Sequence, residues 1–252
     1  MTAKLSGQTA LITGGASGVG HAMATAFADA GAVPHIVDVD QAALDACPAT
    51  WGKSCFDVTD EEAIKALYAD LGEVHILCAN AGTSGPTAPV EDISLADWRA
   101  CTAVNLDAAF LFAKHAAPGM KTRGAGSITI TSSTAGLHGY SNRSPYCASK
   151  WAVIGLAKTL ALELGPHGAR ANAICPGSVS GPRMDGVIAR EAATKGVAEA
   201  DVRAGYTSGV ALRTFVEGAD IANMAVFLAS EQGRYITGQA LSVDGYIVNP
   251  EA

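Results

Sequence analysis

The sequence predicts a single α/β domain in which a parallel sheet of about seven strands carries helices on both faces. Its 252 residues are within the range of one domain. Short apolar runs alternate with longer segments of helical periodicity, which is typical of repeated β-α-β units. Several of the short runs are continuously apolar, as expected of strands that are covered on both faces.

The expected elements follow one another in a regular order. We expect strands over residues 9–12, 33–37, 53–56, 74–78, 127–131, 171–174 and 240–243. The apolar spacing of a helix is present over residues 21–30, 61–71, 95–114, 145–164 and 218–228. Residues 178–216 are the least regular part of the chain, and a long insertion late in such a fold indicates a substrate lid.

Composition argues against several classes of partner and ligand. Only 16% of the residues are charged, the formal net charge is −7, and no basic stretch stands out, which argues against nucleic acid and anionic membranes as partners. So low a charge content indicates self-association. The six cysteines are scattered without a C-x-x-C pair, so we expect reduced thiols and no metal site. Neither a signal-peptide core nor an apolar run of membrane-spanning length is evident, so we expect a cytoplasmic protein.

A glycine-rich segment predicts a dinucleotide site. The first expected strand runs into TGGASGVG (residues 13–20), and an Ala-rich helix follows. Glycines let the backbone turn sharply and approach a pyrophosphate, to which the free N–H groups of the helix N-terminus are then presented. The segment has the strand–loop–helix context that this function requires. We therefore expect the sheet to be of the doubly wound Rossmann type.

Asp38 closes the second expected strand, close to the ~20 residues beyond the glycines at which a ribose-binding acid is expected. A carboxylate there accepts hydrogen bonds from both ribose hydroxyls and repels a 2′-phosphate. Neither the loop nor the residues just after Asp38 include a Lys or Arg that would offset this repulsion. The sequence thus predicts NAD rather than NADP, although a solvated aspartate at a strand end is the alternative interpretation.

Tyr146 and Lys150 are four residues apart, so they share one face of a helix. Pro145 suits the first helical position and Ser144 the N-cap, which places Tyr146 in the first turn. The lysine ammonium and the positive helix end both favour tyrosinate, as a general acid/base requires. Ser133 ends the fifth expected strand, where its hydroxyl either binds a substrate oxygen or caps a turn.

These motifs together resemble the short-chain dehydrogenase/reductase family, in its compact single-domain branch, over essentially the whole chain. The family's glycine loop is matched by Thr13, Gly14, Gly18 and Gly20, and its N-A-G segment by Asn80, Ala81 and Gly82. Its adenine contact is matched by Asp57 and Val58, and its P-G turn by Pro176 and Gly177. Its catalytic tetrad is matched by Asn105, Ser133, Tyr146 and Lys150, including the thirteen-residue separation of Ser from Tyr.

The resemblance implies roles for these residues. Tyr146 would remove the hydroxyl proton of an alcohol while hydride passes to NAD, and Ser133 would position the oxygen. Lys150 would also hold the nicotinamide ribose, and Asn105 would anchor a water of a proton relay, although Asn105 alone equally suits a helix kink. The implied cofactor contacts are Gly14, Ser17, Gly18, Val19, Gly20, Asp38, Asp57, Val58, Asn80, Ala81, Gly82, Tyr146, Lys150, Pro176, Gly177 and Val179. A homotetramer is implied as well, with 95–114 and 145–164 packing against their copies.

Two positions depart from the family pattern. The family often has a second Asn before N-A-G, where this chain has Ala79, and we expect no consequence. A threonine that commonly binds the nicotinamide carboxamide is replaced by Gly181. That contact either comes from Ser180 or is missing.

The substrate class is less sharply defined by the sequence. A small secondary alcohol, a sugar or polyol, or a hydroxy acid fits best, together with the corresponding ketone. An arginine near the site would either clamp a substrate carboxylate or pair with the acids of the lid. The candidate substrate residues are His138, Asn142, Arg183, Met184, Arg190, Arg203 and Tyr206. Alternatives are a 3-oxoacyl reductase or general carbonyl reductase of the same family, a non-catalytic NAD-binding redox sensor, and a structural subunit.

Overall fold

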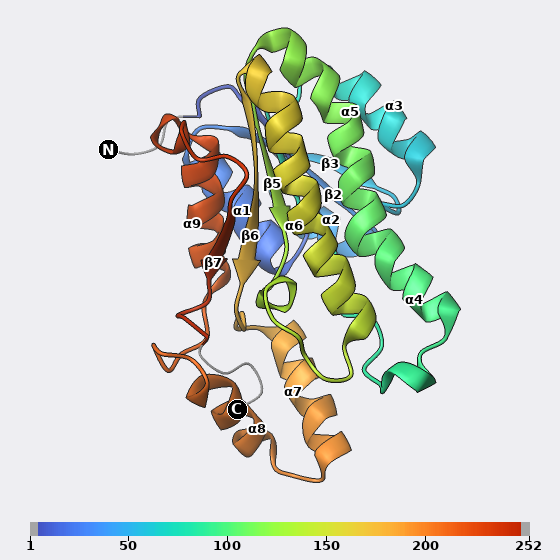
Figure 1. Cartoon of the computed structure of the whole chain (residues 1–252). Helices are drawn as coiled ribbons and strands as arrows, with labels where there is room; N and C mark the ends of the chain where they lie inside the picture. Colours follow the sequence, from blue (N-terminus) through green and yellow to red (C-terminus); the bar gives the residue numbers. More distant parts are fainter. Residues whose placement is uncertain (1–4, 248–252) are drawn as a thin grey trace.

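A computed structural model describes residues 5–247 and shows one parallel sheet between two layers of helices (Figure 1). Neighbouring strands pair in the order β3-β2-β1-β4-β5-β6-β7, and every pair is parallel. The predicted doubly wound sheet of seven strands is thereby confirmed. The strands are β1 (Thr9–Thr13), β2 (Val33–Asp38), β3 (Gly52–Cys55), β4 (Ile76–Ala79), β5 (Gly126–Thr131), β6 (Ala169–Pro176) and β7 (Ala240–Val243).

Helices cover both faces of this sheet. One face carries α1 and α9, which pack against each other, and the other carries α3, α5 and α6. The helices are α1 (Gly18–Asp29), α2 (Gln41–Ala46), α3 (Glu61–Leu71), α4 (Leu95–Thr102), α5 (Ala108–Arg123), α6 (Ser144–Leu164), α7 (Pro182–Lys195), α8 (Glu199–Ser208) and α9 (Gly218–Ala229). The short α2 was not expected from the apolar pattern, because only Leu44 of its six residues is buried.

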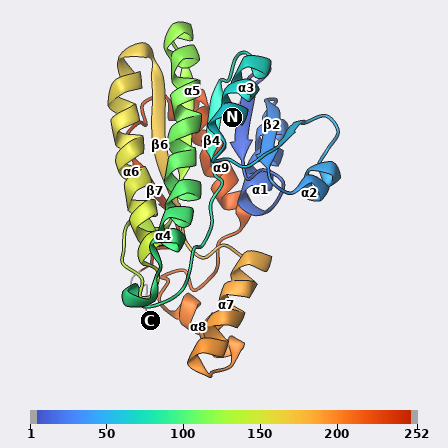
Figure 2. The same ribbon diagram turned by 90° about the vertical axis from the view of Figure 1, so that its right-hand side faces the viewer.

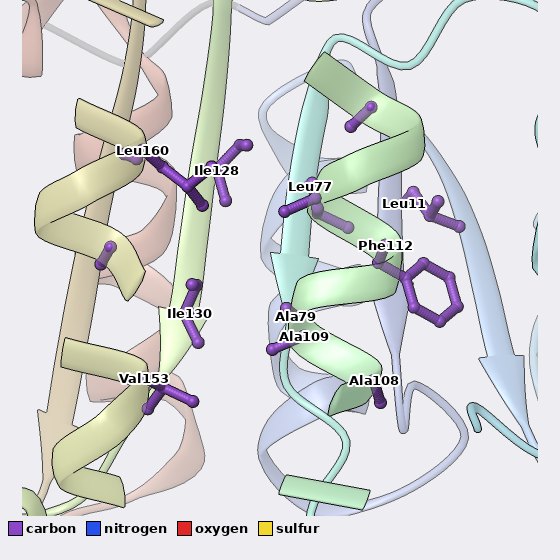
Figure 3. Packing of buried hydrophobic residues seen from close by; sticks show 14 of the residues in the cluster. Leu11, Leu77, Ala79, Ala108, Ala109, Phe112, Ile128, Ile130, Val153 and Leu160 are labelled. Atoms are coloured by element: carbon purple, nitrogen blue, oxygen red, sulfur yellow. The ribbon is translucent and has the colours of Figure 1, made fainter. Parts of the chain in front are cut away.

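The continuously apolar strands are explained by two cores. Successive residues of a strand point to opposite faces, and Leu11 and Ile12 of β1 belong to different buried clusters. Figure 3 shows Val153 of α6 beside Ile130 of β5, and Phe112 of α5 over the neighbouring part of the same face. Both layers of helices are therefore needed to bury the two faces of the sheet from solvent.

The segment 95–114, expected to be one helix, is interrupted. α4 ends at Thr102, a π-helical turn occupies Ala103–Asp107, and α5 then continues to Arg123. The extra residue of a π turn re-aims a side chain, and here the side chain is that of Asn105. Asn105 thus lies in an irregular turn of the helix, as its interpretation as a helix-kink residue requires.

The start of α6 also differs from the prediction. Ser144 is the first helical residue rather than the N-cap, and Arg143 is the N-cap residue. Asn142 has φ +59°, so the chain turns in a left-handed conformation just before the helix, which therefore begins one residue early. Pro145 and Tyr146 still lie in the first turn, as expected.

Residues 178–216 form α7 and α8, which extend beyond the carboxyl edge of the sheet (Figure 2). They pack on each other through a small cluster of their own, centred on Ile188, Ala192 and Val202. Because this cluster is separate from the two cores of the sheet, the helix pair is a distinct layer over the strand ends.

Several large apolar side chains are exposed on the helices expected to meet their copies. They are Leu95 on α4, Phe110 on α5, and Trp151 and Leu162 on α6, with Leu162 80% exposed. Within residues 5–247, no helix is long and apolar enough to cross a membrane, and no group of acidic, His or Cys side chains is placed to hold a metal ion.

Candidate active site

A cavity of about 960 Å³ lies at the carboxyl edge of the sheet, lined by the loops that follow β1 to β6. Parallel α/β sheets bind ligands at this edge, near the point where the strand order reverses between β1 and β4. All the predicted cofactor contacts line the cavity, as does Ser133. Asn105 does not, because it is buried beneath the wall.

The glycine loop forms one end of the cavity. A Cβ on Gly20 would lie 2.0 Å from the carbonyl oxygen of Gly14, so only glycine allows this turn. Ser17 is the N-cap residue of α1, but its side chain does not cap the helix. The positive N-terminus of α1 therefore faces the cavity with no side-chain cap, which suits the pyrophosphate of a dinucleotide.

A hydrogen-bond network fixes the loop to the neighbouring strands. The Thr13 hydroxyl accepts hydrogen bonds from the backbone N–H groups of Asn80 and Ala81, both at 2.9 Å. The Asn80 side chain donates to the Thr13 carbonyl at 3.1 Å and accepts from the Thr131 hydroxyl at 3.1 Å. The ends of β1, β4 and β5 are thus held in fixed relative positions across the cavity floor.

Asp38 lies beside the glycine loop at the end of β2. Its carboxylate accepts hydrogen bonds from the backbone N–H groups of Ala16 at 3.1 Å and Val39 at 2.8 Å. The nearby Lys53 does not line the cavity and donates instead to the Cys47 carbonyl at 2.6 Å. The cations that do line the cavity, Arg143, Lys150 and Arg183, belong to α6, its entrance and α7, not to the segments beside Asp38.

The predicted catalytic side chains meet at the other end of the cavity. The Lys150 ammonium lies 5.8 Å from the centre of the Tyr146 ring and donates to the Thr131 carbonyl at 2.7 Å. Ser133 follows β5, and its oxygen accepts a hydrogen bond from the Ala135 N–H at 3.1 Å. The serine therefore caps a turn, and its own hydroxyl proton is left to donate to a ligand in the cavity.

Close backbone contacts hold this arrangement. The Ser132 hydroxyl donates to the Lys150 carbonyl at 2.8 Å, which ties β5 to α6. A Cβ on Gly136 would lie 2.6 Å from the same carbonyl, and one on Gly82 would lie 3.4 Å from the Lys150 ammonium. Glycine at position 136 therefore lets the segment after β5 approach the helix, whereas the distance from Gly82 to the Lys150 ammonium is an ordinary van der Waals contact.

Burial makes Lys150 electrostatically unusual. The side chain is only 4% exposed, and burial lowers its pKa from 10.5 to about 8, with the nearby charge of Arg183 acting in the same direction. Two other phenols line the cavity, and burial raises the pKa of both Tyr140 and Tyr206. Those two phenols are thereby kept neutral.

Asn105 supports the site from below. Its side-chain oxygen accepts a hydrogen bond from the Thr83 N–H at 2.8 Å, and its amide donates to the Thr83 carbonyl at 3.1 Å and to the Ser149 hydroxyl at 3.0 Å. Ser149 in turn donates to the Tyr146 carbonyl at 2.8 Å. Because these bonds occupy the Asn105 amide, its side chain positions α6, and the water relay remains a prediction.

The candidate substrate residues divide into two groups. Arg183, Met184 and Tyr206 line the cavity, whereas His138, Asn142, Arg190 and Arg203 do not. Arg203 pairs with Asp185 on the lid, as the alternative interpretation held. Sequence reasoning missed Arg143 and Tyr140, which line the cavity between Ser133 and Tyr146. The only available signal was their place in the loop between the two catalytic residues.

Comparison with known proteins decides the family. The family model described as enoyl-(acyl carrier protein) reductase matches residues 14–245. The chain is 33% identical over 250 residues to a cis-4-hydroxycyclohexanecarboxylate dehydrogenase from Sinomonas cyclohexanicum, covering 94% of this chain and 95% of the relative. The chain belongs to the short-chain dehydrogenase/reductase family. It is an oxidoreductase of the alcohol dehydrogenase type.

Two further similarities support this membership. A 2-keto-3-deoxy-L-fuconate dehydrogenase from Xanthomonas campestris pv. campestris is 36% identical, over 96% of this short-chain dehydrogenase/reductase and 80% of the relative. The crystal structure of an NAD⁺-bound xylitol dehydrogenase superposes with a TM-score of 0.90 at 29% identity, covering 96% of this chain and 100% of that structure.

Because Lys150 is buried, we predict that the free energy of unfolding depends on pH. Between pH 8 and 10.5 the unfolded chain keeps the Lys150 proton while the folded protein releases it, so raising the pH favours the folded state. Relative to Lys150→Met, the wild type should gain up to about 3 kcal/mol of unfolding free energy across this range, at about 1.4 kcal/mol per pH unit.

Urea unfolding of the cofactor-free protein at pH 7 and pH 10 measures this difference. Lys158→Met is the matched control, because Lys158 lies on the same helix but is exposed. An equal pH dependence of the wild type and Lys150→Met would show that Lys150 is not a strained buried charge.

Proposed function

We propose that this protein is an NAD-dependent dehydrogenase of secondary alcohols, with Tyr146 as its general acid/base. The observation that carries the proposal is the placement of Tyr146, Lys150 and Ser133 in the same cavity as the uncapped N-terminus of α1. One ligand site thus combines a phosphate cradle with a proton-transfer group.

The proposed reaction assigns one task to each side chain. Bound nicotinamide would supply the hydride acceptor or donor. Tyr146 takes the hydroxyl proton of the alcohol in oxidation and returns it in reduction, while the Ser133 hydroxyl donates a hydrogen bond to the same oxygen. The Lys150 ammonium, fixed by the Thr131 carbonyl, favours the negative charge that develops on the phenol oxygen.

The proposed cofactor contacts are those that line the cavity beside the glycine loop. Asp38 would accept the ribose hydroxyls, and Asp57 and Val58 would border the adenine. Both Ser180 and Gly181 line the cavity, as Pro176 does. The backbone of these two residues and the Ser180 hydroxyl would therefore be available to bind the nicotinamide carboxamide. The helices α7 and α8 would act as the lid over the substrate.

The substrate class is supported by the named relatives. They are named for a hydroxycyclohexanecarboxylate, a ketodeoxyfuconate and xylitol, so hydroxyl-bearing rings and chains are common to them. The family model's description refers to an enoyl reductase, but these relatives are dehydrogenases, which favours chemistry at a CH–OH carbon. A carbonyl reductase would use the same site in reverse. A redox sensor or a structural subunit would have no use for a positioned Tyr–Lys pair.

Replacing the proposed acid/base tests the mechanism. Tyr146→Phe should lower kcat by about a hundredfold or more, because general acid/base catalysis contributes about 10²–10⁴-fold. NAD binding, measured by calorimetry, should persist. NADH absorbance against a panel of cyclic and open-chain hydroxy compounds measures turnover at alkaline pH. Tyr235→Phe, an exposed phenol outside the cavity, is the control, and full activity of Tyr146→Phe would refute the assignment.

Cofactor preference tests Asp38. The wild type should favour NADH over NADPH by roughly tenfold or more, about 1.4 kcal/mol. Asp38→Ala should reduce this ratio because it removes the charge that repels the 2′-phosphate. Asp40→Ala is matched to it, since Asp40 lies two residues further on but caps α2 through the Ala43 N–H and does not line the cavity. The same ratio in all three proteins would exclude Asp38 as its source.

We propose a homotetramer, supported by the exposed apolar side chains Leu95, Phe110, Trp151 and Leu162 on α4 to α6. Light scattering should give about four times the chain mass of 25.5 kDa. Phe110→Glu together with Trp151→Glu should reduce that mass, because charges are costly to bury in an apolar interface. A monomeric wild type would contradict this expectation.

A further inference from the structure

Acidic and basic side chains lie at opposite ends of the cavity. The acids that line it are Asp38 and Asp57 at the ends of β2 and β3, and Glu217 beside the glycine loop. The position of Glu217 follows from its neighbour Gly218, whose added Cβ would lie 3.8 Å from the Gly18 carbonyl. All three acids are thus on the side of the phosphate cradle.

The cations that line the cavity are Arg143, Lys150 and Arg183, and the first two lie beside the ring of Tyr146. The Arg143 guanidinium lies 4.8 Å from the centre of the Tyr146 ring. One of its nitrogens donates to the Ser84 carbonyl at 3.3 Å, while its Nε is buried and has no hydrogen-bond partner among residues 5–247. A buried N–H without a partner is costly, so this guanidinium has unused binding capacity.

Arg183 is the second such cation. It stands in the first turn of α7 and makes only a long contact, 3.5 Å, to the carbonyl of Gly82. Neither Arg143 nor Arg183 forms an ion pair within the described part of the chain. The positive charge of Arg183 also lowers the pKa of Lys150, so two like charges lie near each other in the cavity.

Three carboxylates of α7 and of the turn after β7 have other partners. On the lid, Asp185 pairs with Arg203, and Glu191 pairs with Lys195 at 2.6 Å. Glu191 also accepts a hydrogen bond from the Tyr206 hydroxyl at 2.7 Å. Asp244 accepts from the backbone N–H of Tyr246 at 2.9 Å. Within residues 5–247, Arg143 and Arg183 therefore keep their charge without an ion-pair partner.

We propose that Arg143 and Arg183 form a carboxylate-binding subsite and that the substrate is a hydroxy acid. The inference deepens the proposed function and rests on it, because Tyr146 marks the place of the reacting carbon. A guanidinium binds a carboxylate through two parallel hydrogen bonds, and two guanidinium groups hold it in one orientation. Since Arg143 lies against the ring of Tyr146, the carboxylate belongs a few bonds from the carbinol carbon.

Turnover of matched acids and amides tests the subsite. The probes are 4-hydroxycyclohexanecarboxylate and 3-hydroxybutyrate, each with the primary amide of the same skeleton. The wild type should prefer at least one acid over its amide by about thirtyfold or more in kcat/KM, as expected of charge-assisted hydrogen bonds. Arg143→Gln and Arg183→Gln should abolish this preference through KM for the acid, with KM for NAD unchanged.

Arg203→Gln is the control, because it removes a lid arginine that pairs outside the cavity. It should leave the preference for the acid intact. Equal turnover of acids and amides by the wild type would overturn the subsite and leave the proposed function standing. If Arg143→Gln lowered kcat/KM equally for the acid and the amide, Arg143 would act on Tyr146 and not on the carboxylate, and the subsite would be refuted. A raised KM for NAD in Arg183→Gln would assign Arg183 to the cofactor phosphates.

Binding without turnover separates the two proposals further. Cyclohexanecarboxylate lacks the hydroxyl, so it reports on the subsite alone. Added to the enzyme with NAD, it should raise Tm, and cyclohexanecarboxamide should not, because the amide has no charge to pair. The shift should vanish in Arg143→Gln and Arg183→Gln and persist in Arg203→Gln. A shift of the same size with the amide, or in both arginine variants, would refute the subsite whatever the catalytic result.

Discussion

Burial of one ammonium group is the constraint on which the rest of the site depends. Lys150 is almost fully enclosed, and the carbonyl of Thr131 at the end of β5 is the acceptor that the protein provides for it. A lysine that is taken out of water loses hydration that a single carbonyl replaces only in part, which is why its pKa falls to about 8. This free-energy cost of burying Lys150 arises where α6 and the end of β5 meet at the cavity. In the proposed reaction, a phenolate that develops on Tyr146 would lie beside this ammonium and would recover part of that energy.

Holding that ammonium in place requires backbone to pass unusually close to backbone. Gly136 removes the Cβ atom that would otherwise keep the segment after β5 away from the backbone of α6. The π-helical turn then aims Asn105 at Thr83 and Ser149, so that three segments far apart in the chain share one amide group. In these hydrogen bonds, which are buried or partly buried, each donor has an acceptor within the network. Such networks specify a single arrangement of the side chains. The end of the cavity that holds Lys150 is therefore fixed by contacts between the ends of β4 and β5, the π-helical turn and α6.

The sequence predicted those parts of the molecule that are governed by local pattern. Glu61–Leu71 was predicted to the residue from its apolar spacing, and in the structure Asp60 caps its start and Gly72, with φ +66°, ends it. The glycine loop and the pair Tyr146 and Lys150 were predicted to line one site from residue type and spacing, and they line the same cavity, whereas Asn105 came only from the family resemblance and lies outside the lining. The break at Ala103–Asp107 was not, since it depends on the contact of Asn105 with Thr83, 22 residues away. Arg143 was missed for a similar reason: a loop arginine is ordinarily solvated, and only the tertiary turn at Asn142 brings it over the Tyr146 ring.

The separation of charge along the cavity connects these features to recognition. At one end Asp38, held by the backbone N–H of Ala16 in the glycine loop, is proposed to disfavour an added phosphate. At the other end, Arg143 and Arg183, which form no ion pair among residues 5–247, are proposed to favour an anion. A substrate that carries a carboxylate and a cofactor that lacks a 2′-phosphate would then each be drawn to one end and repelled from the other. Asp38 belongs to β2, Arg143 to the entrance of α6 and Arg183 to α7, so the two ends are built from separate elements. Under the proposed function, cofactor choice and substrate choice would therefore depend on separate elements, and the fold could vary one of them without moving Tyr146, the proposed proton-transfer group.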